Sequence, residues 1–562
     1  MRQPRRRPRA VSYSPATRHF RELFATHAEA ERRKMPVDEV AGERRERLAA
    51  EQRRRSLERE QAEERRLTRR RLLAEATAAG VALTAAGVAA RAGRAASTAR
   101  IAIVGAGLAG IRCAHMLWTG GSRIATTVYE ADTTHLGGRC WSLRGYFQNG
   151  LIGEHGGAFI NHNETGIRNL ARNLGLREEV VNGGDLLTGE EIYWFDGNPY
   201  TYAEANDDWG EIGYPVFKNT YKLAPWPQRY NAFTAEGQRL DFVTVPDWLD
   251  QTGISSTSRF GRLMLANAVS EYGGDPSDQP ALNLLYLLAW NSQNSLEPLP
   301  GYDEKYHVVG GNDQLVTRMV AQLPSGTIKQ GYELVALKDD GDGTYTLTFQ
   351  VGQRTSRVTV DQVVLALPFS TLRDVDLSHA NLSPRKLQAI QQLGMGQSAK
   401  VHVQVQQKTW PPLGYSGVSY TDWDAFCVAW DDSVPLGTSG PAILLGYPGG
   451  STGENVLTGA AHGPAPTRDV SWFLNQIEPI FPGTRAAYSG LAYEDHWSVD
   501  PWHRGAYSYW RLGQYTGFSG YEGVQEGNIH FAGEHTDPEE QGFLNGAVAS
   551  GERAASEVMH QI

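Results

Sequence analysis

The sequence predicts an α/β fold whose parallel sheet begins near residue 100. A short apolar run rich in β-branched residues, at residues 99–104, is followed at once by a glycine-rich turn. Helical spacing of apolar residues then extends from Ile111 to Trp118, and a second β-branched run follows at residues 126–129. The order strand, turn, helix and strand is typical of the unit that starts a parallel sheet covered by helices.

The turn has the spacing of a dinucleotide-binding loop. Gly105 permits a tight turn, Gly107 lets a pyrophosphate approach the backbone, and Gly110 lets the helix pack closely on the strand. The N-terminus of that helix offers free N–H groups and partial positive charge to phosphates. Glu130 follows the second run, 20 residues past Gly110, where a carboxylate accepts hydrogen bonds from ribose hydroxyls. These residues predict a Rossmann-like dinucleotide site, but they do not distinguish NAD from FAD.

Length and composition indicate a globular enzyme of more than one unit. The 562 residues exceed a single hydrophobic core and suggest two or three folded units. Hydrophobic residues make up 41% of the chain and charged residues 21%, which is ordinary for a globular protein. The three cysteines, Cys113, Cys140 and Cys427, form neither a disulfide framework nor a metal motif. We expect structural thiols and no metal site.

The net charge of −9 conceals two regions of opposite sign. Residues 1–100 contain 25 basic and 13 acidic side chains, which leaves 29 basic and 50 acidic side chains in the remainder. An acidic body argues against nucleic acid as a partner and favours cationic ligands. An acidic surface that serves only solubility is the alternative.

The N-terminal residues predict a leader rather than part of a core. Residues 1–67 are charged and poor in large apolar residues, so we expect a mobile segment. Residues 68–96 combine consecutive arginines at Arg69 and Arg70 with an apolar run at 76–90 and small residues, and they resemble a twin-arginine export signal. The run is shorter than the roughly 20 residues of a membrane span, so no stable span is expected. An Ala-rich helix on a cytoplasmic protein is the alternative.

Two segments beyond the turn resemble the flavin amine oxidase family, which includes monoamine and polyamine oxidases. They are residues 135–139, with Gly-Gly-Arg, and residues 154–160, with Glu-His-Gly-Gly. The resemblance implies that Gly138 and Arg139 lie near the pyrophosphate of FAD. It also implies that Gly156 and Gly157 run close to the flavin ring. The resemblance therefore favours FAD over NAD.

The resemblance continues to the C-terminus. The further segments that carry it are residues 308–315, 333–337, 361–368 and 528–551. It implies that the backbone of Val335 faces the adenine and that Gly533 and Glu534 lie beside the pyrophosphate and the ribityl chain. It also implies that a helix beginning near Asn545 points its positive end at the flavin N1–C2 carbonyl, which stabilises the anionic reduced flavin.

Three residues are expected to act in the chemistry. Residues 393–401 resemble the family segment whose lysine holds a water against flavin N5 and is associated with the reaction with oxygen, which assigns this role to Lys400. A solvent-facing lysine at the start of an alternating strand is the alternative. Tyr507 and Phe543 match the aromatic pair that flanks the amine in monoamine oxidases, with core packing as the alternative. Ala506 stands where those enzymes carry the cysteine that bonds FAD, so the FAD is expected to be non-covalent.

The expected reaction is oxidation of a small amine by FAD to an imine and then an aldehyde, with oxygen reduced to hydrogen peroxide. An L-amino acid oxidase is the first alternative. Such enzymes usually carry an arginine soon after the segment at 154–157, and this chain has none at 157–160, although Arg511 could serve. A desaturase or isomerase of the same fold is the second alternative. A flavoprotein kept as a binding module is disfavoured by Lys400 and the aromatic pair.

Two interleaved domains are expected, a Rossmann-like FAD-binding domain and a substrate domain with a mixed sheet and helices. The FAD-binding domain takes residues 97–170, 301–372 and 496–562, and the substrate domain takes residues 171–300 and 373–495. The second part of the substrate domain is expected to begin with a helix near residues 383–393. Residues 185–248 are rich in Tyr, Trp, Pro and Gly, which predicts loops. The oligomeric state is left open, a homodimer being one option.

Overall fold

The parallel sheet predicted at the start of the chain is the centre of one half of the molecule. A computed structural model describes residues 99–121, 123–181, 189–297, 303–433 and 439–562. The predictions for residues 1–67 and 68–96 lie outside these residues. All five strands of the sheet are parallel. In spatial order they are β23 (Ile529–Phe531), β13 (Gln362–Leu365), β1 (Ile101–Val104), β2 (Thr127–Glu130) and β9 (Ile328–Gln330).

The neighbours in this sheet come from distant parts of the sequence. β1 is paired with β13 on one side, 261 residues later in the chain at Ile101 and Gln362, and with β2 on the other. β1, β13 and the edge strand β23 are buried throughout, as expected for a parallel sheet that is covered on both faces. The α/β fold class predicted from the sequence is confirmed.

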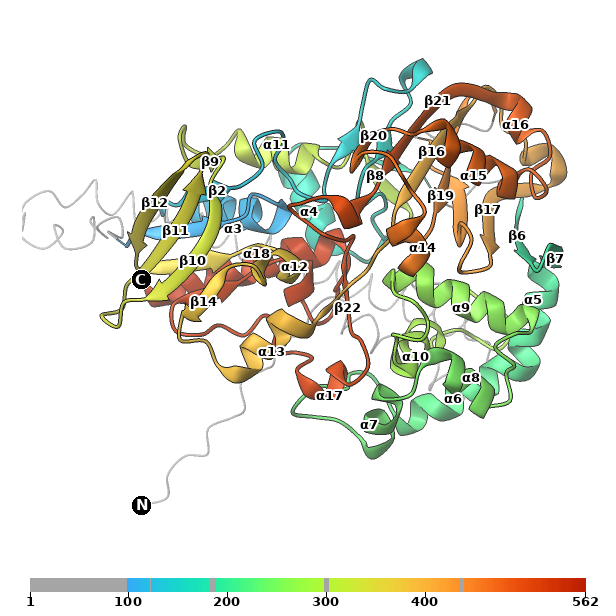
Figure 1. Ribbon diagram of the computed structural model, residues 1–562, viewed down its shortest axis with the longest axis horizontal. Helices are drawn as coiled ribbons and strands as arrows, with labels where there is room; N and C mark the ends of the chain where they lie inside the picture. The colour runs from blue at the N-terminus through green and yellow to red at the C-terminus, as the bar shows by residue number, and fades with distance from the viewer. Residues whose placement is uncertain (1–98, 122, 182–188, 298–302, 434–438) are drawn as a thin grey trace, which may run out of the picture. The chain divides into compact units, whose positions relative to one another are not determined.

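Two helices cover this sheet and pack on each other. α3 (Leu108–Thr119) follows the glycine turn, and α18 (Leu544–Gln561) is the last element of the chain. They lie side by side, blue beside red, in Figure 1. Gly551 makes this approach possible, because a Cβ there would overlap the carbonyl oxygen of Ala109. The first and last helices of the described chain therefore close the same layer.

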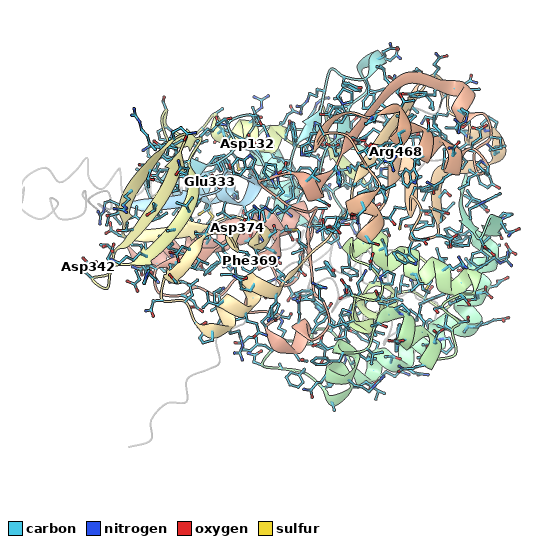
Figure 2. The ribbon with its side chains drawn as sticks, viewed as in Figure 1. Asp132, Glu333, Asp342, Phe369, Asp374 and Arg468 are labelled. Atoms are coloured by element: carbon cyan, nitrogen blue, oxygen red, sulfur yellow. The ribbon has the colours of Figure 1, made fainter. Side chains whose placement is uncertain are left out.

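A smaller sheet lies beside the parallel one. Its spatial order is β12 (Arg354–Val360), β11 (Tyr345–Val351), β10 (Glu333–Asp339) and β14 (Asp376–His379). The exposed Asp342 lies in the turn between β10 and β11 and marks one end of this sheet in Figure 2. The register between β10 and β11 shifts between Leu334 and Ala336, so Val335 has no partner in that ladder.

The other half of the molecule contains an eight-stranded mixed sheet. Its spatial order is β20 (His462–Pro464), β21 (Tyr488–Asp495), β16 (Lys400–Val405), β19 (Ala442–Tyr447), β18 (Val428–Asp431), β17 (Tyr415–Thr421), β6 (Glu190–Phe195) and β7 (Asn198–Thr201). β6 and β17 run parallel and the other neighbours antiparallel. The central strand β16 is buried on both faces, including Lys400 at its start. The alternating pattern after Lys400 predicted the strand but left the burial of this lysine open.

Helices gather on one side of this sheet. They are α5 (Tyr202–Asp208), the π-helix η3 (Trp209–Gly213), α6 (Tyr214–Leu223), α7 (Ala235–Asp241), α8 (Val245–Gln251), α9 (Arg259–Tyr272) and α10 (Ala281–Leu288). α9 packs against β6 and β17. The remaining helices are α4 (Thr165–Asn173), η1 (Gln148–Gly150), α11 (Gln314–Val320), α12 (Phe369–Leu372), α13 (Pro384–Gln392), η4 (Pro411–Leu413), α14 (Gly450–Asn455), α15 (Thr467–Ile477), α16 (Thr484–Ala487), η5 (Trp497–Val499), α17 (Gln514–Gly517) and η6 (Glu534–Thr536).

The expectation of loops at residues 185–248 is wrong for residues 189–248. Most of this stretch is helical, because threonines accept hydrogen bonds from N–H groups of the first turn at the starts of α5, α7 and α8. Its aromatic side chains are core residues, as the fully buried Trp209 and Phe217 illustrate. The helix expected near 383–393 is confirmed by α13. No helix in the described part of the chain is both long and apolar enough to cross a membrane.

Three short ladders connect the segments that meet between the two larger sheets. They are β3 (Ser142–Leu143) with β4 (Gly153–Glu154), β5 (Glu178–Val180) with β8 (Tyr306–Val308), and β15 (Gly394–Met395) with β22 (Ser508–Tyr509). The last ladder brings the segment that leads into Lys400 beside the segment that carries Tyr507. An isolated bridge between Ile160 and Tyr306 brings residues 306–308 close to the segment that follows β4.

Candidate functional site

The glycine turn has the geometry of a phosphate-binding loop. Gly105 has a φ of +102°, and a Cβ there would lie 2.6 Å from the carbonyl oxygen of Ala366. A Cβ at Gly110 would overlap the carbonyl oxygen of Gly105, so the first turn of α3 requires glycine at this position. A Cβ at Gly107 would meet nothing closer than the Gly137 carbonyl oxygen at 3.9 Å. No side chain caps the N-terminus of α3, so its free N–H groups are open to a phosphate.

Glu130 lies where a ribose is expected. Its Oε2 accepts a hydrogen bond from Ala106 N–H at 2.6 Å, and its Oε1 accepts one from Asp132 N–H at 2.9 Å. Burial raises the pKa of Glu130, although these two bonds oppose the shift. Each carboxylate oxygen keeps a lone pair, so the side chain can still accept from two hydroxyls. These residues fit a bound dinucleotide.

Arg139 and Glu534 form a mostly buried ion pair next to the loop. Arg139 donates to Glu534 Oε1 at 2.7 Å and to the carbonyl oxygen of Ala506 at 2.8 Å. Glu534 also accepts hydrogen bonds from the Ser508 N–H and hydroxyl and from the Gly542 N–H. Burial opposes ionisation of Glu534, but Arg139 outweighs it and lowers the pKa of that carboxyl group.

The glycine pair of the second motif is packed against the first motif and against the start of α18. A Cβ at Gly156 would overlap the carbonyl oxygen of Arg139, and a Cβ at Gly157 would lie 2.7 Å from the Leu544 side chain. Gly138 and Gly533 both have positive φ, +57° and +127°. The backbone at these positions therefore approaches its neighbours more closely than any other residue type permits.

Lys400 is buried at the centre of the molecule, with 4% of its surface exposed. Its ammonium group donates to the carbonyl oxygens of Glu154 and Gly156, both at 2.8 Å. An ammonium has three N–H donors, and among the described residues no third acceptor bonds Lys400. One N–H is therefore left for a water or a cofactor atom. This places the predicted oxygen lysine directly on the segment predicted to run along the flavin.

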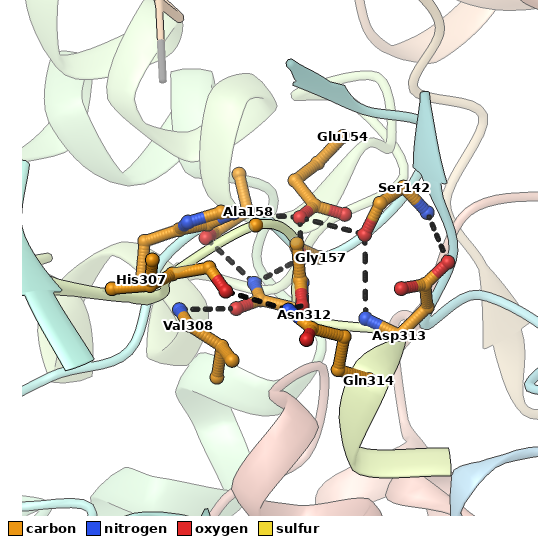
Figure 3. Close-up of polar contacts among 12 residues, drawn as sticks. Ser142, Glu154, Gly157, Ala158, His307, Val308, Asn312, Asp313 and Gln314 are labelled. Carbon is orange, nitrogen blue, oxygen red and sulfur yellow. Dashed lines mark hydrogen bonds and ion pairs between the residues drawn. The ribbon is translucent and has the colours of Figure 1, made fainter. Parts of the chain in front are cut away.

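The segment that accepts from Lys400 is held by a buried polar network (Figure 3). Glu154 Oε1 accepts hydrogen bonds from His307 Nε2 at 2.6 Å, Ser142 Oγ at 2.9 Å and Asn312 N–H at 2.9 Å. The Asn312 side-chain amide donates to the carbonyl oxygens of Gly157 and Ala158. Burial opposes protonation of His307, but its bonds to Glu154 and Glu179 outweigh this and raise its pKa to about 9.

Glu154, His307 and Asn312 were not predicted as functional residues. Asn312 lies in the resemblance at 308–315, and Glu154 in the one at 154–160, but the sequence does not show that they bond each other across 158 residues. A glutamate or asparagine adjacent to paired glycines is the local signal that could have indicated them.

The predicted aromatic pair lies at the end of the ladder formed by β15 and β22. The Tyr507 hydroxyl donates to the carbonyl oxygen of Ser270 at 3.0 Å and accepts from the Tyr447 hydroxyl at 3.1 Å. Gly542, the neighbour of Phe543, faces the Tyr507 ring, because a Cβ there would lie 3.7 Å from it. Both Tyr507 and Phe543 are partly exposed, as side chains that line a binding site have to be. The structure thus brings the segment that carries Phe543 beside Tyr507.

The helix expected near Asn545 begins one residue earlier, at Leu544, and no side chain caps it at Phe543. Asn545 itself anchors the neighbouring element: its Oδ1 accepts from the Ile167 N–H at 2.7 Å and its Nδ2 donates to Glu540. The free N–H groups of the first turn of α18 are therefore the groups open to a ligand, and the Asn545 side chain holds α18 against α4.

Near the predicted aromatic pair, the charged group that affects the pKa of Tyr507 is a carboxylate and not a guanidinium group. Glu271, adjacent to Ser270, acts with burial and Tyr447 to raise the pKa of Tyr507. Burial and the nearby Glu304 raise the pKa of Glu271 to about 8. Arg511, the arginine considered for a substrate carboxylate, instead forms a half-exposed ion pair with Asp278 at 2.9 Å.

The cysteines are buried and unbonded to one another, and burial raises the pKa of Cys113 to about 12. One group of potential metal ligands exists among the described residues: His155, His462 and Asp495. Both Nδ1 atoms lie 2.6–2.7 Å from Asp495 Oδ1. These are hydrogen-bond distances, whereas neighbouring ligands around a tetrahedral zinc ion are about 3.3 Å apart.

Comparison with known proteins agrees with this site. The sequence profile of flavin-containing amine oxidoreductases matches residues 108–559. The L-amino acid dehydrogenase of Synechocystis sp. is 23% identical over 81% of this chain and 94% of its own length. Flavin-containing amine oxidase A of Equus caballus is 23% identical over 82% of this chain and 85% of its own.

Solved structures share the fold. Cyclohexylamine oxidase from Brevibacterium oxydans superposes with a TM-score of 0.69 at 21% identity, over 82% of this chain and 99% of that one. The profile match covers most of the chain and includes Gly110, the Gly-Gly-Arg segment and the C-terminal motif. This chain belongs to the flavin-containing amine oxidoreductase family.

Proposed function

We propose that the protein is an FAD-dependent amine oxidase that converts a small amine to an imine, which water hydrolyses to an aldehyde, while oxygen is reduced to hydrogen peroxide. A bound flavin supplies the hydride acceptor, and the chain binds and orients the reactants and excludes water. In this proposal Tyr507 and Phe543 flank the amine, and Lys400 holds a water or oxygen through its free N–H.

The observation that carries the proposal is the environment of Lys400. A buried ammonium bonded to two carbonyl oxygens, with one donor left over, is expensive to desolvate unless it has a function or a partner. Its two acceptors belong to the motif that resembles the flavin-contacting segment. Lys386, another buried lysine that donates to two carbonyl oxygens, also lies over the Phe531 ring at 3.8 Å, and no such ring contact is found for Lys400 among the described residues.

FAD is favoured over a shorter flavin because the chain has groups for the adenosine half. Glu130 keeps lone pairs for ribose hydroxyls, and Val335 lies at a register shift that leaves its backbone out of the ladder with β11. The FAD is expected to be non-covalent, since Ala506 offers no nucleophile before Tyr507.

An amine without a carboxylate is favoured over an L-amino acid. A substrate carboxylate in a desolvated site needs a cationic partner. Residues 157–160 contain no arginine, and Arg511 is paired with Asp278. Oxidation of an L-amino acid, the activity named for the Synechocystis relative, is the second candidate.

The experiment uses the purified protein with its natural flavin. Acid precipitation should release the flavin into the supernatant, where chromatography before and after phosphodiesterase treatment identifies FAD by its conversion to FMN. A panel of monoamines, diamines and L-amino acids, assayed for peroxide in air, then separates the candidates. Flavin that stays with the pellet would contradict the non-covalent assignment. No peroxide in air, but turnover with an artificial electron acceptor, would make the protein a dehydrogenase instead of an oxidase.

Export by a twin-arginine signal at residues 68–96 remains part of the proposal, since that pathway carries folded proteins with their cofactors bound. Replacement of Arg69 and Arg70 by lysine should leave the full-length protein inside the cell. Unchanged export of that variant would contradict the assignment.

A further inference from the structure

A buried carboxylate, Asp495, accepts hydrogen bonds from three imidazoles. His155 Nδ1 lies 2.7 Å and His462 Nδ1 2.6 Å from Asp495 Oδ1, and His402 Nε2 lies 3.2 Å from Oδ2. Asp495 and His402 have no exposed surface, and His155 is almost fully buried. We call these four residues the Asp495 cluster. Such an arrangement is costly to bury unless charges within it compensate each other.

The Asp495 cluster lies directly beside Lys400. In the antiparallel register of β20, β21 and β16, Asp495 is opposite His462 on one side and Lys400 on the other. Directly opposite residues point to the same face of a sheet, and His402 shares that face because it is two residues from Lys400. His155 lies outside this sheet, between Glu154 and Gly156. The carbonyl oxygens of those two residues accept hydrogen bonds from Lys400. The Asp495 cluster therefore adjoins Lys400 from the strand β21, through Asp495, and from the segment 154–156, through His155.

The Asp495 cluster is extended by two further buried residues, and His462 is its most exposed member. His462 Nε2 bonds Asp500 at 2.9 Å, and Asp500 bonds His503 Nδ1 at 2.9 Å. The side chain of His462 keeps 11% of its surface exposed, whereas Asp495 keeps none. The ionisable groups that face the cluster from the surrounding elements are Lys400, Asp432, Tyr493, Asp500, His503 and, across the Trp141 ring, His135.

The electrostatics indicate that this cluster holds a proton at neutral pH. Burial opposes ionisation of Asp495, but the imidazoles outweigh it and keep the pKa of that carboxyl far below its usual range. Burial likewise opposes protonation of His462, but its bonds to Asp495 and Asp500 raise its pKa to about 9. The pKa of His402 is raised by Asp432 and Asp495 against the effect of burial. A buried carboxylate therefore coexists with at least one imidazolium.

We propose that the Asp495 cluster stores the proton that the Lys400 site consumes when oxygen is reduced. This inference rests on the proposed oxidase function. Reduction of O2 to H2O2 takes two electrons and two protons. Both electrons and one proton arrive with the reduced cofactor, so one proton must come from elsewhere. In the proposal an imidazolium N–H bond breaks, its electron pair stays on nitrogen, and an O–H bond of the peroxide forms. His462, the most exposed member, then takes a proton back from water.

Asp495 is a positioning residue in this scheme, because it holds the imidazolium, and the imidazolium is the proton donor, which acts through the water that Lys400 holds. Asp495→Asn removes the charge that holds the proton and keeps the size of the side chain. His462→Gln is the milder variant and keeps a hydrogen-bonding group on a partly exposed side chain. His530→Gln is the matched control. His530 is as fully buried as Asp495 and bonds Glu557 and Gln362, but it lies in β23 of the parallel sheet.

The test reduces each holoenzyme with light or dithionite, so that it needs no substrate, and mixes it with oxygen in a stopped-flow instrument. We expect both cluster variants to retain flavin and to reoxidise about 10-fold or more slowly, the size of a lost proton donor. In both variants we also expect a solvent isotope effect on reoxidation that differs from that of the wild type. The decline of the wild-type reoxidation rate near pH 9 should be absent from them. His530→Gln should match the wild type in all three. Imidazole ¹⁵N spectra should show two histidines that titrate near pH 9, His462 and His307, and only the His462 signal should be lost in His462→Gln.

Wild-type reoxidation rates with an unchanged pH profile in His462→Gln would overturn the inference, as would ¹⁵N spectra with every cluster histidine neutral at pH 7. These outcomes are independent of whether any amine reduces the flavin. A failure of the proposed function would instead appear as a flavin that no amine bleaches.

Discussion

The ammonium nitrogen of Lys400 lies 2.8 Å from the carbonyl oxygen of Gly156, although 244 residues separate the two in the sequence. Gly156 in turn is packed on the backbone of Arg139, whose side chain bonds Glu534. A continuous line of contacts thus joins the lysine assigned to oxygen, the glycine pair assigned to the flavin ring and the ion pair assigned to the pyrophosphate. The consequences of removing each part differ and can be measured separately.

Replacement of Lys400 by methionine should slow reoxidation by oxygen about 100-fold or more, while the flavin content falls little. The reason is that methionine keeps the buried volume but removes the one free N–H. Stopped-flow mixing of the reduced protein with oxygen measures it. Lys386→Met is the matched control, since Lys386 is also buried and also donates to two carbonyl oxygens, those of Tyr521 and Glu522, but lies on α13. Equal oxygen kinetics in Lys400→Met and the wild type would refute the assignment.

The two aromatic residues should act through their rings. Tyr507→Phe removes the bonds to Ser270 and Tyr447 but keeps the ring, so we expect kcat/KM for the best amine to fall only a few-fold. Tyr507→Ala and Phe543→Ala should lower it about 10-fold or more, because a ring face contributes roughly 0.5–1.5 kcal/mol beyond its burial. Steady-state kinetics with a peroxide readout provide the comparison. If Tyr507→Ala is no worse than Tyr507→Phe, the ring does not guide the substrate.

Arg139 should be needed for flavin retention rather than for the chemical step. Arg139→Met leaves Glu534 buried without its main counter-charge, and removal of one partner of a buried pair typically costs 3–5 kcal/mol. We therefore expect the purified variant to contain little flavin and to unfold at lower temperature. The ratio of flavin to protein absorbance measures the flavin content. The double variant Glu534→Gln with Arg139→Met should recover part of the lost unfolding temperature. Full flavin occupancy in Arg139→Met would show that this side chain is not at the cofactor.

The bond between His307 and Glu154 predicts a dependence of stability on pH. The pKa of His307 is raised in the folded state to about 9, above the roughly 6.5 of an unfolded histidine. Its contribution is therefore fully present below pH 6.5 and is lost as the pH rises toward and through 9. His307→Gln should be less stable than the wild type at pH 6, and the difference should shrink by pH 9.5. Thermal melts at several pH values measure this, and a difference that does not depend on pH would contradict a charged His307.

Local patterns in the sequence predicted the elements whose geometry is local. The run at residues 101–104 followed by the glycine turn is one example, because strand, turn and helix propensities agree there. The same reasoning failed at residues 189–248, where aromatic residues suggested loops but are buried at the contacts between short capped helices. Composition alone does not show which aromatic side chains face a core.

The support of Lys400 could not be predicted from the sequence for a different reason. His155 and Asp495 are 340 residues apart, and their contact depends on the register of β16 with β21. A shift of one residue in that register would turn Asp495 to the opposite face of the sheet. Motifs identify the segments that surround a flavin, but pairing across sheets decides which charged groups stand behind them.

The central claim is that an amine, and not an amino acid, reduces the flavin of this protein. The most direct measurement mixes the purified holoenzyme with single amines and L-amino acids under anaerobic conditions and follows the flavin absorbance. We expect at least one amine to bleach the flavin and the colour to return, with formation of peroxide, when air is admitted. Bleaching by L-amino acids with none by any amine would contradict the account.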